Sequence, residues 1–217
     1  MTHRISFTAW LAASLASVTA SAGVLQVDVS SRDGQPLVDA VVIVEPVGNP
    51  KAASPASAPV TIDQQRMQFI PAVAVVTRGS TLRFTNRDGW DHHVRGIPLG
   101  NLAQGDSARG FEMRLAGHSG QGEPASQTVL MDRAGPFQLG CHLHSSMRGA
   151  VFVTDSPWHG KTDAQGVMRL QDVPEGPARI RVWHADQLVD AAPVDVTVQA
   201  LTVTSIPTQI TPRRRRP

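Results

Sequence analysis

Alternating apolar and polar positions predict that this chain is all-β. Residues 24–30 (VLQVDVS) alternate as a half-buried strand does, and similar short runs recur between turn-forming residues. No amphipathic helical period extends beyond two turns. The predicted strands are 24–30, 40–44, 67–69, 72–77, 81–85, one through Val94, 110–115, 128–131, 136–140, 150–154, 167–170, 178–184, and one or two within 194–206. Short strands at this spacing are typical of a β-sandwich or barrel.

The N-terminus predicts export. A basic start precedes an apolar stretch from Ile5 to Val18, and Ala20-Ser21-Ala22 supplies the small residues that a signal peptidase reads. The apolar stretch is too short to span a membrane. We therefore interpret residues 1–22 as a signal peptide. We expect the mature protein to begin near Gly23, to have no membrane span and to be periplasmic.

Composition divides the rest of the chain. Residues 47–61 are rich in Pro, Ala and Ser, which predicts a linker before a domain at 62–155. Residues 27–46 resemble the first half of a carboxypeptidase-regulatory-like (prealbumin-like) sandwich, and residues 162–176 (TDAQGVMRLQDVPEG) resemble part of its second half. Each half is too small to bury a core alone. We expect 23–46 and 156–208 to form one split sandwich. Two independent sub-domains are the alternative.

The basic charge comes from the ends of the chain. There are 20 Lys and Arg and 18 Asp and Glu, a net charge of +2. Without Arg4 and Arg213–Arg216, 15 basic residues face 18 acidic ones, a net charge of about −3. Residues 209–217 thus form a basic tail, either solvated or touching acidic surfaces. Nothing in this pattern indicates nucleic acid.

One cysteine carries the candidate chemistry. In an exported protein a lone Cys141 is a free thiol, an intermolecular bridge or a metal ligand. Residues 140–150 (GCHLHSSMRGA) place Cys141, His144 and Met147 at Cys-x2-His-x2-Met spacing. Two soft sulfur atoms and an imidazole suit a copper ion that alternates between Cu(I) and Cu(II). A trigonal site needs a second His from elsewhere in the chain.

The upstream motif supplies that histidine. Residues 86–94 (NRDGWDHHV), with the strands before them, resemble the plastocyanin/amicyanin family of cupredoxins over roughly 62–154, with matches at Asn86, Gly89, Trp90, His92 and Val94. The resemblance implies a Greek-key cupredoxin sandwich, inserted in or flanked by the prealbumin-like one. It implies a single type 1 copper ion bound by His92, Cys141, His144 and Met147, with Asn86 tying the first ligand strand to the Cys loop. His93 and His142 are the alternative ligands. Otherwise they face solvent, which is the favoured interpretation, or they support the ligands from outside or recruit another ion.

These features favour an electron carrier over an enzyme. No nucleophile elbow, phosphate loop or second set of copper ligands is present in the sequence. The resemblance implies electron transfer with a redox partner such as a cytochrome or dehydrogenase. Composite chains of this type are often labelled as methylamine utilisation proteins, which does not establish an amine substrate. A copper-sequestering protein and a structural module are the alternatives. His118, His159 and His184 are interpreted as surface or interface residues.

Overall fold

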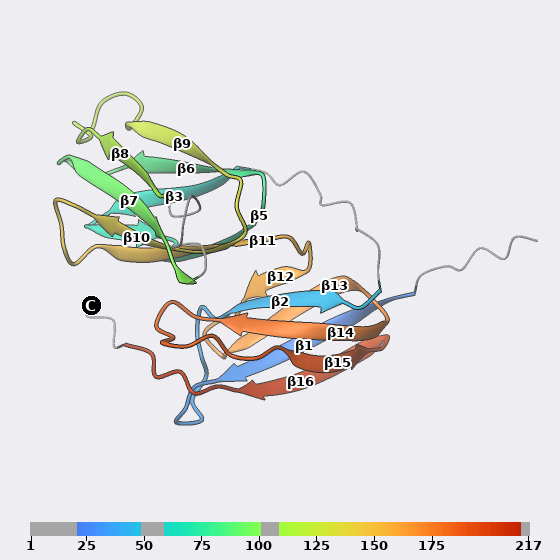
Figure 1. The fold of residues 1–217 in the computed structure, drawn as a ribbon. Coiled ribbons are helices and arrows are strands. Elements are labelled where there is room, and N and C mark those ends of the chain that lie inside the picture. The colour runs from blue at the N-terminus through green and yellow to red at the C-terminus, as the bar shows by residue number, and fades with distance from the viewer. Residues whose placement is uncertain (1–20, 49–58, 101–108, 214–217) are drawn as a thin grey trace, which may run out of the picture.

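The computed structural model describes residues 21–48, 59–100 and 109–213, and this part of the chain is all-β, as predicted. The signal-peptide prediction lies outside it except for residues 21–22, as do most of the predicted linker and the last four residues of the tail. Among the residues described, no helix is long and apolar enough to cross a membrane. Figure 1 shows two stacked β-sandwiches.

The upper sandwich in Figure 1 is formed by the middle of the chain. One sheet has the order β5-β11-β10-β7-β8 and the other β4-β3-β6-β9. The strands are β3 (Val60–Gln65), β4 (Gln68–Ile70), β5 (Val73–Thr77), β6 (Ser80–Asn86), β7 (His92–Pro98), β8 (Phe111–Leu115), β9 (Ser126–Met131), β10 (Gly135–Cys141) and β11 (Arg148–Thr154).

The second sandwich combines strands from both ends of the chain. β1 lies between β13 and β16, while β2 lies between β12 and β14, with β15 at the edge. The strands are β1 (Ala22–Ser30), β2 (Val41–Pro46), β12 (His159–Lys161), β13 (Val167–Pro174), β14 (Gly176–Trp183), β15 (Val194–Val198) and β16 (Leu201–Pro207). Residues before and after the middle domain therefore share the same two sheets.

Period-2 alternation builds a separate core in each sandwich. In β1, alternate residues such as Leu25 and Val27 are fully buried while their neighbours are partly exposed. In β11, Val151 and Val153 point into the core of the middle sandwich. The opposite face of β11 carries Phe152, which joins a third apolar cluster.

That third cluster connects the two sandwiches. It contains Val41 and Ile43 of β2, Trp183 of β14, and Val73, Ala150 and Phe152 of the middle domain. The rings of Phe152 and Trp183 lie 5.3 Å apart between centroids. Aromatic side chains contribute large buried areas, so this contact fixes one domain against the other. It also covers part of the outer face of the sheet that carries the candidate metal ligands.

Several boundaries differ from the sequence expectation. The predicted linker 47–61 is too long, because β3 begins at Val60 and pairs with β6. The predicted tail begins too early, because Ile210 is buried in the core of the second sandwich and its carbonyl accepts from Arg32 N–H. Of the two interpretations of His184, surface or interface, the surface one is wrong, because His184 is buried with Nε2 3.2 Å from the Val38 carbonyl oxygen.

Candidate metal centre

His92 and His93 begin strand β7 and point to opposite faces of the sheet. His92 is fully buried, whereas the His93 side chain is 24% exposed. Successive side chains of a strand alternate between faces, so the burial of Val94 in the core fixes His92 on the same inner side. Of the two candidate upstream ligands, His92 therefore faces the interior and His93 the outer surface.

Cys141 is the last residue of β10 and lies beside β7. It pairs in register with Val94, two residues after His92. The chain then turns through an exposed loop, in which the Met147 N–H donates to the His144 carbonyl at 3.0 Å. Cys141 and Met147 are buried in the same apolar cluster, while His144 is partly exposed. Hydrogen bonds at the loop base thus return the chain to the core.

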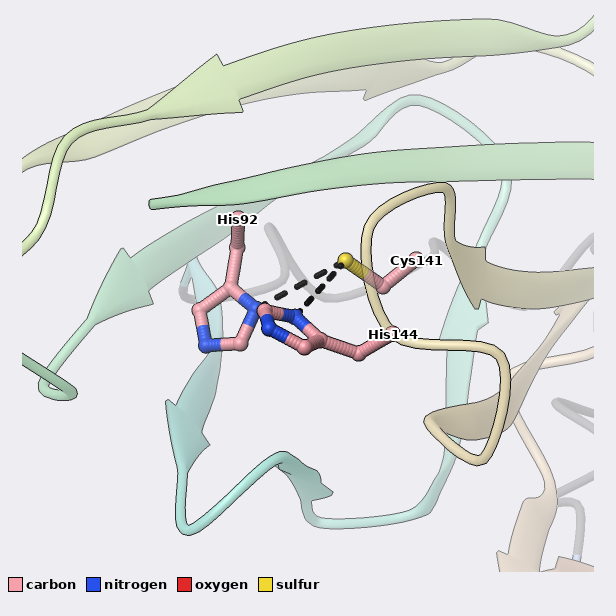
Figure 2. Close-up of side chains that lie close together, drawn as sticks. All are labelled: His92, Cys141 and His144. Atoms are coloured by element: carbon pink, nitrogen blue, oxygen red, sulfur yellow. Dashed lines mark hydrogen bonds between the residues drawn. The ribbon is translucent and has the colours of Figure 1, made fainter. Parts of the chain in front are cut away.

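Three ligand atoms converge at this end of the sandwich (Figure 2). His92 Nδ1 lies 3.6 Å from Cys141 Sγ and 3.1 Å from His144 Nδ1, and His144 Nδ1 lies 3.5 Å from Cys141 Sγ. Three ligands around one ion in a trigonal plane, with metal–nitrogen and metal–sulfur bonds of the usual lengths, are about 3.5–3.7 Å apart. The observed triangle is therefore the right size to hold one ion.

Asp88 completes the surroundings of His92 and was missed by the sequence analysis. Its Oδ2 lies 2.9 Å from His92 Nε2, and both side chains are buried. Its carboxylate also accepts from the backbone N–H groups of Arg66 and Met67, at 2.6 and 3.0 Å. Burial of this carboxyl raises its pKa, but the donors at Met67, His92 and Arg66 outweigh burial, and the pKa of Asp88 lies below its usual range.

An ionised Asp88 determines which nitrogen of His92 is free. A carboxylate accepts hydrogen bonds only, so Nε2 carries the proton and Nδ1 presents its lone pair to Cys141 and His144. The only sequence signal was the position of Asp88, four residues before His92. This spacing alone does not indicate that the two side chains are in contact.

Asn86 is fully buried but does not have the contacts expected of it. The sequence resemblance implied a tie to the Cys loop. Instead, Asn86 Nδ2 donates to the carbonyl oxygens of Trp90, Leu115 and Ala116, at 2.8, 3.3 and 2.9 Å. Its Oδ1 accepts from the Asp88 N–H at 2.9 Å. Asn86 therefore holds together the segment that carries Asp88, rather than the loop that carries His144.

The donor set fits a single type 1 copper ion. Two imidazole nitrogens and one thiolate in a triangle, with a thioether in the same buried cluster, suit copper better than a hard cation such as Mg²⁺ or Ca²⁺. Within the part of the chain that the structure describes, these three residues are the only group of His, Cys, Asp or Glu whose ligand atoms meet this closely.

A family comparison points to the same domain. Residues 56–154 match the family model described as copper binding proteins of the plastocyanin/azurin family. No curated protein matches the chain. Similar solved structures include a reduced amicyanin variant with 20% identity, covering 51% of this chain and 98% of that one at a TM-score of 0.35. A Cu(I) amicyanin variant has 21% identity, 53% and 98% coverage and a TM-score of 0.36.

The family match covers the strands and loops that carry all the candidate ligands. It excludes β1, β2 and the strands after Thr154, which form the second sandwich. The described part of the chain is therefore a cupredoxin-like domain, which matches the plastocyanin/azurin family of copper binding proteins over residues 56–154, beside a second all-β sandwich.

Proposed function

We propose that this chain is a periplasmic electron-transfer protein in which His92, Cys141, His144 and Met147 bind one type 1 copper ion. The observation that carries the proposal is the convergence of His92 Nδ1, His144 Nδ1 and Cys141 Sγ within 3.6 Å of one another. When bound there, copper supplies a one-electron couple between Cu(I) and Cu(II).

Burial and hydrogen bonding hold the donors in place. His92 is oriented by Asp88, and Cys141 lies on a strand paired with both β7 and β11. Electron transfer benefits from a site whose ligands do not rearrange between oxidation states, because each rearrangement adds to the barrier. Ligands on paired strands satisfy this requirement better than ligands on free loops.

His144 provides the route to the surface. It is partly exposed, whereas His92 is fully buried. Leu143, immediately before it, is 49% exposed. An exposed apolar residue beside a ligand offers a surface on which a redox partner can dock briefly. We therefore propose that electrons enter and leave through the His144 edge.

Export to the periplasm is part of the proposal and rests on the signal-peptide pattern of residues 1–22. The partner class that suits a one-electron periplasmic carrier is a cytochrome or a dehydrogenase. Arg213, the described residue of the basic C-terminal run, pairs with Asp186 of the same chain, with Nε 3.7 Å from Oδ1. In this ion pair an arginine of the run binds a carboxylate, which supports an acidic surface as the partner of the tail.

The test is a copper titration of the exported full chain, followed by visible spectroscopy and voltammetry. We expect one equivalent of Cu(II) to produce an intense thiolate-to-copper band and a reversible one-electron wave. Cys141→Ser should lose the band, whereas Ser145→Ala in the same exposed loop should retain it. A coloured Cys141→Ser protein would disprove the ligand assignment. Copper that binds but cannot be reversibly reduced would favour sequestration.

A further inference from the structure

A second cluster of metal-binding side chains lies on the outer face of the same sheet. His93 follows His92 on β7, and His142 follows Cys141 after β10, so both point away from the buried site. Their rings lie 5.0 Å apart between centroids. Glu112 of β8 approaches the same place, with Oε2 3.6 Å from His93 Nε2. The cluster combines two imidazoles and a carboxylate from β7, β8 and the residue after β10, which lie side by side in the sheet.

The two rings are stacked with their planes 26° apart, and their separation equals that of two imidazoles sharing one ion. With metal–nitrogen bonds of about 2.0 Å, two imidazoles on a tetrahedral ion have centroids about 5 Å apart. Rotation of each ring about its Cβ–Cγ bond hardly moves its centroid, and this torsion is broad for histidine. Such a rotation can aim one nitrogen of each ring at a shared point without moving the backbone.

The distance between Glu112 and His93 also suits two ligands of one ion. At 3.6 Å, Oε2 and Nε2 are too far apart for a hydrogen bond. Two ligand atoms on one tetrahedral ion are separated by about 3.3 Å, close to this distance. The carboxylate also lies 3.9 Å from Nε of Arg95, which is 42% exposed and can turn into solvent. Glu112 is therefore positioned to act as a third ligand or to orient His93.

The backbone fixes the pair while leaving it accessible. His142 N–H donates to the His93 carbonyl oxygen at 2.9 Å. The two residues therefore cannot separate without breaking this backbone hydrogen bond. Both side chains reach solvent, His142 more than His93. An incoming ion would keep one coordination position for water. This combination of fixed backbone and open access is suitable for binding a metal ion from solution.

We propose that His93, His142 and Glu112 form a second, surface metal site for a divalent transition-metal ion that prefers imidazole, such as Zn²⁺ or Cu²⁺. Imidazole ligands exclude Mg²⁺ and Ca²⁺ as its natural occupants. The site is separate from the type 1 centre because its donors lie on the other face of the sheet. It goes beyond the proposed electron-transfer function and does not depend on it.

The experiment is a calorimetric titration of Zn²⁺ into the full chain after loading with one equivalent of copper. We expect the wild-type chain to bind one Zn²⁺, and His93→Ala and His142→Ala each to weaken this by about tenfold or more. Glu112→Gln should weaken it less. His118→Ala, which removes an imidazole outside the cluster, should bind as wild type. Equal binding by all five proteins would overturn the proposal.

A second readout separates this site from the buried one. In the copper-free chain, Zn²⁺ can enter both sites, and His93→Ala should then weaken one of the two binding events by about tenfold or more and leave the other unchanged. This difference persists even if the buried site proves not to be a type 1 centre. Zinc should also raise the denaturation midpoint of wild type more than that of His93→Ala, because binding to the folded state stabilises it. Two zinc-binding events of unchanged affinity in copper-free His93→Ala would contradict the site.

Discussion

The carboxylate of Asp88 lies 2.9 Å from Nε2 of His92, on the side of the ring away from Cys141. The same carboxylate caps the β3–β4 hairpin, where Arg66 and Met67 have φ values of 54° and 57°. Two residues with positive φ are typical of a type I′ turn, which is costly without glycine or asparagine. The hydrogen bonds that the Arg66 and Met67 N–H groups donate to Asp88 offset part of that cost. Asp88 thus connects the turn geometry to the orientation of a candidate ligand.

Replacement of Asp88 should alter both copper binding and potential. Asp88→Asn removes a negative charge that favours Cu(II) and weakens the hold on the His92 tautomer. We expect copper affinity to fall by about 10–100-fold and the reduction potential to rise, while the colour persists. The turn loses part of its cap, so the free energy of unfolding should fall by about 1–3 kcal/mol. Voltammetry, competitive copper titration and urea denaturation measure the three effects.

Asp91→Asn is the matched control for this charge change. Asp91 is an exposed carboxylate three residues later, and its Oδ1 accepts from the Gly117 N–H rather than from a histidine. Its removal changes the net charge equally but leaves His92 with its partner. A potential shift of the same size in both variants would show that Asp88 acts only as a distant charge.

The copper ligands could be predicted from the sequence, whereas the residues that surround and orient them could not. Cys141, His144 and Met147 are close in sequence, so their common loop was visible from spacing alone. His92 required a motif, because its distance from Cys141 in space depends on the pairing of β7 with β10. Asp88 and Glu112 could not be identified, since isolated carboxylates have no pattern until the strands bring them to a histidine.

Strands with a local pattern could likewise be predicted, whereas strands that depend on distant pairing could not. Long alternating runs such as Val24–Ser30 identified β1, whereas β3 was hidden by the neighbouring Pro/Ala/Ser-rich segment. The three-residue β12 was missed because His159-Gly160-Lys161 has no alternation, and it exists only through pairing with β2. The burial of Ile210 was also unpredictable, because it depends on a core formed by residues far away in the sequence.

The two adjacent histidines should behave oppositely in the copper protein. His92→Ala opens a position that water or added imidazole can fill, so the visible spectrum should change sharply. His93→Ala should leave the colour nearly intact, because this side chain lies on the outer face of the sheet. Spectra of the two variants with one equivalent of Cu(II) measure the difference. The reverse result would mean that the register of β7 is shifted by one residue.

Contact between the sandwiches should contribute strongly to stability. Phe152→Ala leaves a cavity beside Trp183 and should lower the free energy of unfolding by about 3–5 kcal/mol. Copper colour should survive, since Phe152 points away from the core that contains Cys141. Leu130→Ala, at a position 59% exposed, should change stability by less than about 0.5 kcal/mol. Urea denaturation compares them, and similar midpoints for both variants would argue against the contact.

His159 should make stability depend on pH. Burial lowers the pKa of His159 below 6.5, while its hydrogen bond to the Ser156 carbonyl opposes this effect. The unfolded chain therefore binds a proton more readily. Its contribution to stability is present above pH 6.5 and is lost as pH falls through the folded-state pKa. His159→Gln should lose less stability than wild type between pH 7.5 and 5.5 in urea denaturation. An unchanged pH dependence would contradict this assignment.

Met147 provides the sharpest test of electron transfer as opposed to copper storage. It is buried in the same cluster as Cys141, where an axial thioether would donate weakly and would stabilise Cu(II) somewhat more than Cu(I). Met147→Leu conserves volume, so the fold should lose less than about 1.5 kcal/mol. Loss of the donor disfavours Cu(II) more than Cu(I), and the potential should rise while the colour persists. Met147→Gln supplies a harder oxygen donor, and the potential should fall. Met131→Leu, buried in the same cluster, should leave it unchanged. If both Met147 substitutions moved the potential in one direction, the axial role would be wrong, because only a ligand that distinguishes the two oxidation states produces opposite shifts.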